Sequence, residues 1–287
     1  MAEFMSMPDP DALLPVAHDV IDKAVDYVLT NPVTGVRQKD AHEIVTDADV
    51  AVECLVRAAL SQVDTTVGFL GEETGAVGDP NTYWVLDPID GTTNFSHGLP
   101  LSSISLGLVH DGSPILGVIA VPFLGRRYWA THAGGAYRDG ARIQVSKTAD
   151  LSKALVALTD YGGPQPGIDD LLCRELDREL TTRAQGLRRL GSTAVELAFV
   201  AEGSLDASIS IWNGTWDTAA GAVIAREAGA VVMDADGSPH STQSRCAIAV
   251  TPALRDAILS VLEIARGTRY WPAEAGNTPV RSSAPRS

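Results

Sequence analysis

Three apolar stretches in the first half of the chain constrain its fold most. They cover Leu101–Val109, Pro114–Val121 and Arg127–Thr131, and turns rich in Gly, Asp and Pro separate them. Short apolar runs with such breaks predict consecutive antiparallel strands. Before them, apolar residues recur at helical spacing over Leu13–Val28 and again over Ala48–Ser61. The first half is therefore expected to pack two helices against a sheet rich in antiparallel strands.

After Ser146, strand-like and helix-like segments alternate, which is typical of α/β structure. Strands are predicted at Leu155–Thr159, Gly186–Leu190, Leu205–Ile211, Ala230–Met233 and Ala247–Val250, and helices at Asp169–Thr181, Ser192–Ala201, Thr218–Ala228 and Pro252–Ala265. The chain is thus predicted to have an N-terminal α+β half at 8–146 and a smaller C-terminal α/β half at 147–266. Residues 267–287 are polar and rich in Pro, Ser and Arg, so we expect a disordered tail.

Composition excludes several classes of protein. The net charge of −14 disfavours nucleic acids and anionic membranes as partners, and no apolar run approaches the about 18 residues of a membrane span. The N-terminus lacks a secretion-like pattern. Cys54, Cys173 and Cys246 are odd in number and widely spaced, which argues against zinc and disulfide frameworks. We therefore expect a cytoplasmic protein whose cysteines are small buried hydrophobes.

The segment VLDPIDGTTNF places two aspartates three residues apart at the end of an apolar strand. In such a turn Asp87 and Asp90 can converge on one point, with the carbonyl of Ile89 as a third hard ligand. Gly91 lets the backbone approach a ligand, and the amides of Gly91 and Thr92 can face an anion. The pattern indicates a metal site joined to a phosphate cradle. An ordinary Asp/Pro/Gly turn is the alternative.

Two further acidic positions fall at the ends of predicted elements. Glu72 and Glu73 follow a short apolar run, and Asp217 precedes an alanine-rich helix. Taken singly, the glutamates are compatible with a solvated turn and the aspartate with a helix N-cap. Together with Asp87 and Asp90 they offer carboxylate oxygens, which hard divalent cations prefer. Metal-assisted chemistry on a phosphate is the function that this set favours.

At this point the chain resembles a known family, the magnesium-dependent, lithium-sensitive inositol monophosphatases. The resemblance covers roughly residues 13–265, and its motifs are Ile44–Glu53, Gly71–Glu73, Asp87–Phe95, Leu190–Ala194 and Trp216–Asp217 followed by Ala220–Gly221. It implies a layered αβαβα sandwich, a homodimer, and two or three Mg²⁺ ions in each site. It also implies a phosphatase that hydrolyses a small phosphorylated alcohol by direct attack of a metal-bound water.

The resemblance assigns roles residue by residue. The implied metal ligands are Glu72, Asp87, the carbonyl of Ile89, Asp90 and Asp217. The implied catalytic residues, which orient or deprotonate the water, are Glu73, Thr92 and Asp49. The residues expected to contact the substrate or its phosphate are Asp90, Gly91, Thr92, Gly191, Ser192, Thr193, Ser210 and Asp217.

Ser210 departs from the family pattern. Inositol-type members carry a glutamate seven residues before the Trp-Asp aspartate, where it accepts hydrogen bonds from the ring hydroxyls, and this chain has Ser210 there. Inositol 1-phosphate is the expected substrate. Histidinol phosphate, fructose 1,6-bisphosphate and a 3′-phosphonucleotide such as 3′-phosphoadenosine phosphate remain alternatives on the same fold.

Two other classes of protein are compatible with parts of the sequence. The run Asp47-Ala48-Asp49-Val50 resembles the start of the haloacid-dehalogenase phosphatase motif, in which the first aspartate is a nucleophile, but Ala51 stands where that motif has Thr or Val. A non-catalytic protein that kept the fold is the second alternative. The presence of every implied metal ligand argues against it.

Overall fold

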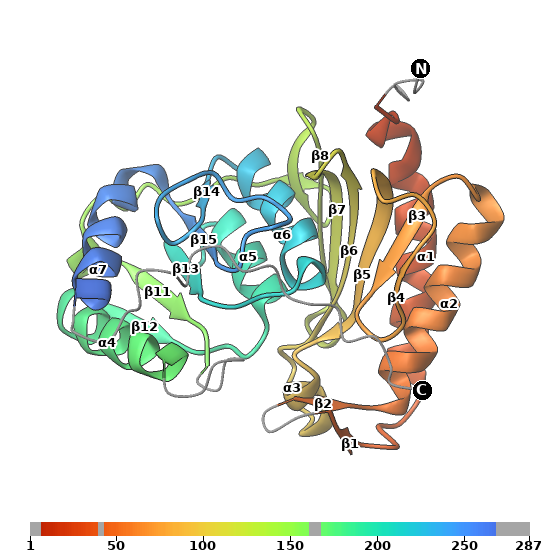
Figure 1. Ribbon diagram of the computed structural model, residues 1–287, viewed down its shortest axis with the longest axis horizontal. Coiled ribbons are helices and arrows are strands. Elements are labelled where there is room, and N and C mark those ends of the chain that lie inside the picture. Colours follow the sequence, from red (N-terminus) through yellow and green to blue (C-terminus); the bar gives the residue numbers. More distant parts are fainter. Residues whose placement is uncertain (1–6, 40–42, 161–167, 268–287) are drawn as a thin grey trace.

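The computed structural model describes residues 7–39, 43–160 and 168–267. These residues form five layers, in which two β-sheets alternate with three pairs of helices (Figure 1). The helices are α1 (Pro10–Thr30), α2 (Asp47–Val63), α3 (Thr92–Ser96), α4 (Ile168–Arg183), α5 (Thr193–Ala201), α6 (Thr215–Glu227) and α7 (Arg255–Gly267), with 3₁₀ turns at η1 (Pro122–Leu124), η2 (Leu151–Lys153) and η3 (Pro252–Leu254). The predicted αβαβα sandwich is confirmed.

The larger sheet has the strand order β10-β9-β8-β7-β6-β5-β3-β4. Its strands are β3 (Gly68–Gly71), β4 (Gly75–Val77), β5 (Thr82–Asp90), β6 (Ser103–His110), β7 (Ser113–Val121), β8 (Arg126–Thr131), β9 (Gly135–Arg138) and β10 (Ala141–Arg142). Only β3 and β5 pair in parallel, so the expected antiparallel character is confirmed. The short strands β4, β9 and β10 were not predicted, because each lies beside glycine-rich turns that suggest a loop.

The smaller sheet has the order β12-β11-β13-β15-β14. Its strands are β11 (Leu155–Leu158), β12 (Gly186–Arg188), β13 (Ala207–Ser210), β14 (Val231–Met233) and β15 (Ala247–Val250). The strand β11 is parallel to both of its neighbours, whereas β15 is antiparallel to β13 and β14. A separate hairpin of β1 (Arg37–Gln38) and β2 (Ile44–Val45) lies near α3 (Figure 1). All five strands predicted after Ser146 are present.

Each helix pair buries an apolar face against a sheet. Helices α1 and α2 cover the outer face of the larger sheet, α5 and α6 lie between the sheets, and α4 and α7 cover the far face of the smaller sheet (Figure 1). The middle layer is packed closely enough to need glycine: a Cβ on Gly221 of α6 would lie 2.5 Å from Leu197 of α5. This packing fixes the first turn of α6, which carries Asp217, beside the larger sheet.

The structure corrects three expectations. The strand expected to end at Asp87 continues to Asp90 with a bulge between the two aspartates, because β6 pairs with both. Helix α6 begins at Thr215, so Asp217 lies inside its first turn and is not the N-cap. Cys54 is exposed, because it lies on the outer side of α2, whereas Cys173 and Cys246 are buried as expected.

The predicted disordered tail at 267–287 lies outside the described residues, apart from Gly267, which is the last residue of α7. Among the described residues, no helix combines the length and the apolar content that crossing a bilayer requires.

Candidate active site

Three aspartates meet where the larger sheet faces the first turn of α6. One carboxylate oxygen from each of Asp87, Asp90 and Asp217 lies within 4.8 Å of the others. The bulge in β5 makes this possible, since it lets two aspartates three residues apart approach one point. Asp87 also accepts a hydrogen bond from the Ile89 amide at 3.0 Å, which shapes the bulge. The predicted convergence of these carboxylates is therefore present.

Burial and mutual repulsion make these carboxylates costly to ionise without a cation. Burial raises the pKa of Asp87 and Asp217 well above the usual range, and the charges of the neighbouring carboxylates add to the effect. Burial also raises the pKa of Asp90 to about 6, although hydrogen bonds from Ser192 and Ala194 oppose the shift. A bound divalent cation would reverse this balance. Clustered oxygen donors of this kind fit the ligand preference of Mg²⁺.

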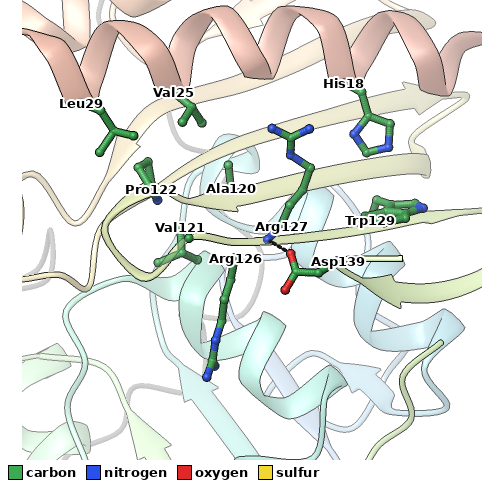
Figure 2. A pocket seen from close by; sticks show the side chains of 11 residues that line it. His18, Val25, Leu29, Ala120, Val121, Pro122, Arg126, Arg127, Trp129 and Asp139 are labelled. Carbon is green, nitrogen blue, oxygen red and sulfur yellow. Dashed lines mark hydrogen bonds between the residues drawn. The ribbon is translucent and has the colours of Figure 1, made fainter. Parts of the chain in front are cut away.

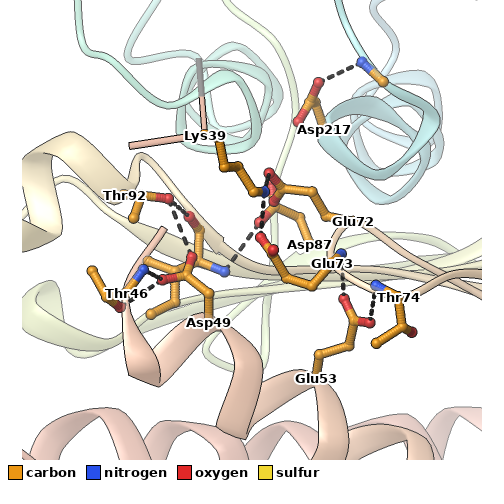
Figure 3. Close-up of polar contacts among 12 residues, drawn as sticks. Lys39, Thr46, Asp49, Glu53, Glu72, Glu73, Thr74, Asp87, Thr92 and Asp217 are labelled. Atoms are coloured by element: carbon orange, nitrogen blue, oxygen red, sulfur yellow. Dashed lines mark hydrogen bonds and ion pairs between the residues drawn. The ribbon is translucent and has the colours of Figure 1, made fainter. Parts of the chain in front are cut away.

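A fourth acidic group, Glu72, lies at the end of β3 beside Glu73. The ammonium group of Lys39 donates to both glutamates, at 2.7 Å to Glu72 Oε1, and so links the β1–β2 hairpin to the cluster (Figure 3). Burial is the largest cause that raises the pKa of Glu72 to about 7 and that also raises the pKa of Glu73.

Glu53 of α2 holds the turn that carries these glutamates. Its carboxylate accepts from the amides of Glu73 and Thr74, each at 2.8 Å (Figure 3). A side chain on Gly71 would collide with this carboxylate. Glu53 is fully buried, and the sequence analysis did not assign it a role. The sequence could have identified Glu53, because it is an acidic residue on the face of α2 that also carries the buried residues Val52 and Val56.

Asp49 connects the start of α2 to Thr92, the first residue of α3. Its Oδ2 closes the capping box with Thr46, accepting from the Thr46 amide at 2.8 Å and hydroxyl at 2.6 Å. Its Oδ1 lies 3.2 Å from the hydroxyl of Thr92, which is 2.9 Å from the carbonyl oxygen of Ile89 (Figure 3). Burial raises the pKa of Asp49. The Thr92 hydroxyl thus has two acceptors for its one proton.

Gly91 lies where the backbone is most crowded. Its φ of 84° is in the left-handed region, and a Cβ would lie 2.9 Å from the carbonyl oxygen of Gly191. Only glycine combines this conformation with this approach at no steric cost. Helix α3 begins directly after it, at Thr92. The Gly91–Thr92 backbone is therefore brought into contact with the turn before α5.

A cavity of about 410 Å³ opens over the carboxylate cluster. One side, the β5 wall, is formed by Glu72, Asp87, Ile89, Asp90, Gly91 and Thr92. The opposite side, the α5 wall, is formed by Thr159, Asp160, Gly191, Ser192, Thr193, Glu196, Trp212 and Asn213. Asp217 also lines the cavity. Among the residues that the sequence assigned to the site, Asp49, Glu73 and Ser210 do not line this cavity.

Ser210 lies behind the α5 wall. It is 1% exposed, and its hydroxyl is 2.7 Å from the side-chain amide of Asn213 and 3.3 Å from the Thr193 hydroxyl. The hydroxyl is therefore already engaged with neighbouring side chains. Trp212 and Asn213, which follow β13, reach the cavity instead. The position that the family pattern gives to a carboxylate is thus occupied by a neutral hydrogen-bonded group.

A larger cavity, of about 570 Å³, lies between α1 and the strands β7 and β8 (Figure 2). Its lining includes Val25, Leu29 and Trp129, and its arginines have acidic partners: Arg127 pairs with Asp22 and Arg126 with Glu202. Three converging carboxylates of the kind described above are not among its lining residues. Size alone therefore does not identify the site, and the smaller cavity is the candidate.

Asp47, the nucleophile that the haloacid-dehalogenase motif would need, lies on the surface. It pairs with Arg37 at 2.6 Å, and this ion pair lowers its pKa. It is not among the residues that line the 410 Å³ cavity. A nucleophile must reach the phosphate in that cavity, so the geometry does not support this class of phosphatase.

Comparisons with known proteins agree with this geometry. A family model described as the inositol monophosphatase family matches residues 11–266. Inositol-1-monophosphatase ImpA of Mycolicibacterium smegmatis is 33% identical over 88% of this chain and 92% of its own length. The probable inositol 1-monophosphatase ImpA of Mycobacterium tuberculosis is 39% identical over 78% of this chain and 84% of its own.

Solved structures show the same architecture. An IMPase of Thermotoga maritima superposes with a TM-score of 0.82 at 28% identity, covering 88% of this chain and 98% of its own. Inositol monophosphatase of Anabaena gives a TM-score of 0.81 at 29% identity, covering 88% of this chain and 96% of its own. The family match extends over nearly all of the described residues. The chain belongs to the inositol monophosphatase family.

Proposed function

We propose that the protein is a Mg²⁺-dependent phosphomonoesterase, a hydrolase that releases phosphate from a small phosphorylated alcohol, with inositol 1-phosphate as its substrate. The observation that carries this proposal is the convergence of Asp87, Asp90 and Asp217 within 4.8 Å at a cavity also lined by Gly91 and Thr92. Acidic side chains alone would repel a phosphate. The cluster therefore suits a phosphate only with divalent cations between the two.

Two or three Mg²⁺ ions are proposed to bind to the carboxylates of Glu72, Asp87, Asp90 and Asp217 and to the carbonyl of Ile89. When bound, they would supply Lewis acidity to the phosphate oxygens and to the attacking water. The chain's own contribution is to hold these donors in place: the Gly214 amide donates to Asp217 at 2.6 Å, and the Ala194 amide donates to Asp90 at the same distance.

Thr92 and Asp49 are proposed to orient the attacking water. Thr92 lines the cavity, and when its hydroxyl donates to Asp49 Oδ1 the hydroxyl oxygen can still accept a hydrogen bond from water. Asp49 is held rigidly by Thr46, so the direction of this hydroxyl is set by the fold. Glu73 is a further candidate for accepting the proton. The backbone amides of Gly91 and Thr92 would bind the phosphate.

The identity of the alcohol is the finer part of the proposal. The α5 wall, with Gly191, Ser192 and Thr193, is proposed to contact it. The Ser210 hydroxyl is neutral and already hydrogen-bonded to Thr193 and Asn213, so it does not replace the family's carboxylate, and other alcohols should be tested as well. The alternatives are histidinol phosphate, fructose 1,6-bisphosphate and a 3′-phosphonucleotide. The proposal also includes inhibition by lithium, a homodimer and a cytoplasmic location.

The test is an activity panel on the purified chain. Phosphate release from inositol 1-phosphate and from the alternative esters is measured with Mg²⁺, with EDTA, and with Mg²⁺ plus lithium. The proposal expects release that requires Mg²⁺, is fastest on inositol 1-phosphate and falls with lithium. A rate on histidinol phosphate far above that on inositol 1-phosphate would overturn the substrate, and release that persists in EDTA would overturn the metal dependence.

A further inference from the structure

Glu196 is a buried carboxylate at the cavity for which the proposed mechanism has no use. It lies on α5, is 3% exposed and belongs to the α5 wall. Its Oε1 accepts from the Leu190 amide at 3.2 Å, and its Oε2 accepts from the Ser208 hydroxyl of β13 at 3.0 Å. Burying a carboxylate costs free energy unless hydrogen bonds compensate for the lost water. The groups that bind to Glu196 indicate its role.

Leu190 begins the turn that leads to α5, and both its amide and its carbonyl are held by side chains. Glu196 accepts from its amide, while the side chain of Asn94 donates to its carbonyl at 2.7 Å. Asn94 belongs to α3, which begins at Thr92 directly after Gly91. The first residue of the turn is therefore fixed between the β5 wall and the helix that follows it.

The rest of the turn is part of the α5 wall and contacts Gly91 and Asp90 of the β5 wall. Gly191 has a φ of 69°, and its carbonyl oxygen lies against Gly91. The Ser192 hydroxyl and the Ala194 amide donate to Asp90 at 2.5 and 2.6 Å. The Thr193 hydroxyl lies 3.3 Å from Ser210. A shift at Leu190 would thus move the groups proposed to face the alcohol.

We propose that Glu196 is a positioning residue that sets alcohol selectivity by fixing the Leu190–Thr193 turn. This inference rests on the proposed function, because it concerns the same site and the same reaction. Glu196 acts through the turn: its bond to Leu190 places Gly191, Ser192 and Thr193 against the leaving group. The reacting phosphate is held mainly by the β5 wall. Loss of Glu196 should therefore weaken recognition of the alcohol more than the chemistry on phosphorus.

The variants separate geometry from charge. Glu196→Leu keeps the side chain's bulk and removes both acceptors. Glu196→Gln keeps an acceptor for Leu190 and offers an amide that can donate to Ser208. Burial raises the pKa of Glu196 to about 8, so a neutral amide is a close mimic of a group that is partly protonated near neutral pH. Ser208→Ala removes one of the two bonds and leaves the carboxylate in place.

The experiment compares two substrates in saturating Mg²⁺. One is the alcohol phosphate that the wild-type enzyme hydrolyses best, and the other is p-nitrophenyl phosphate, whose leaving group has no hydroxyl to recognise. For Glu196→Leu we expect KM for the alcohol phosphate to rise about tenfold, with less change in kcat. On p-nitrophenyl phosphate, kcat/KM should change by less than about threefold. For Glu196→Gln, kcat/KM should stay within about threefold of the wild-type value on both substrates.

A merely structural role gives a different result. Equal losses on both substrates in Glu196→Leu, or a wild-type ratio between them, would overturn the inference. If Glu196→Leu does not fold, Ser208→Ala decides: KM for the alcohol phosphate should rise about two- to fivefold while p-nitrophenyl phosphate is unaffected, and an unchanged ratio overturns the inference. Failure of the proposed function is seen separately, as a wild-type enzyme without Mg²⁺-dependent phosphatase activity.

Discussion

The two walls of the cavity differ in how far apart in the chain their residues lie. The β5 wall comes from a short stretch, Glu72 to Thr92, and only Asp217 joins its carboxylates from far along the chain. The α5 wall collects residues from the end of β11, the turn before α5 and the segment after β13. The first wall is thus a property of local sequence, and the second is a property of the assembled fold. Chemistry on phosphate can stay fixed while alcohol recognition changes.

The largest effect should come from the β5 wall. In Asp90→Asn a carboxylate of the cluster becomes neutral, and we expect kcat/KM to fall by about a thousandfold or more on every substrate, since the proposed metal loses a charged ligand. Steady-state kinetics with a Mg²⁺ titration measure this. The matched control is Asp47→Asn, which changes an exposed aspartate outside the cavity and should leave activity within about twofold of wild type. Unchanged activity in Asp90→Asn would refute the metal assignment.

The α5 wall should instead change the ratio between substrates. Ser210→Glu introduces the carboxylate that the family pattern has at this position. Ser210 is buried behind the wall, so the longer glutamate side chain must extend past Asn213 to reach the cavity. A charged acceptor for hydroxyls there should raise kcat/KM on inositol 1-phosphate about tenfold relative to p-nitrophenyl phosphate. Ser210→Gln controls for the added length, because it reaches equally far without the charge. If the two variants shift the ratio equally, charge at this position does not select the alcohol.

A pH-dependent stabilisation by Mg²⁺ would test the electrostatics of the cluster. Folding raises the pKa of Asp90 to about 6 and of Glu72 to about 7, so between about pH 4 and 7 the folded state binds more protons than the unfolded state. The metal-free protein should therefore lose stability from these groups as pH rises through that window. Mg²⁺ needs the ionised forms and should raise the thermal midpoint more at pH 8 than at pH 5.5.

Differential scanning fluorimetry with Mg²⁺ and with EDTA at both pH values measures this difference. We expect several degrees more stabilisation by Mg²⁺ at pH 8, given that binding at about 100-fold above Kd is worth about 2.7 kcal/mol. The Asp217→Asn variant is the control, since it removes one of the three clustered carboxylates. Equal stabilisation at both pH values would contradict the proposed role of these groups.

The smallest effect should come from the support behind the β5 wall. Glu53→Ala leaves the amides of Glu73 and Thr74 without their acceptor, which should cost about 1–3 kcal/mol in the free energy of unfolding. The Mg²⁺ concentration for half-maximal activity should rise a few-fold, because Glu72 is no longer held. Urea unfolding and a Mg²⁺ titration measure the two effects. Glu263→Ala, at an exposed position of α7, should change neither.

The same contrast explains what the sequence could predict. The strands β6 to β8 and the convergence of Asp87 and Asp90 depend on local periodicity and turn chemistry, which are visible in one segment at a time. The layered αβαβα arrangement was implied by the family resemblance. The placement of Ser210 behind the wall depends on a register between β13 and β15 and on partners from α5. Glu53, Lys39 and Glu196 likewise acquire their roles through contacts with residues that are distant in the chain.

Pro88 and the bulge explain the misplaced strand end. A proline between two aspartates suggests that a strand has finished, since proline removes a ladder donor. In the fold β5 continues past Pro88, because the bulge absorbs the interruption and β6 pairs again with Asp90. The carboxylates therefore lie inside a sheet and not in an exposed turn, and this accounts for their burial.

The middle layer of helices has a consequence for how the molecule unfolds. Helices α5 and α6 bury one face against Ile119 and Tyr128 of the larger sheet and another against Ala157 and Ala249 of the smaller one. Neither sheet could lose these helices without exposing a continuous apolar surface. The two halves on either side of residue 146 should therefore melt in a single cooperative transition, and a chain cut there should give fragments that remain associated rather than two independent folding units.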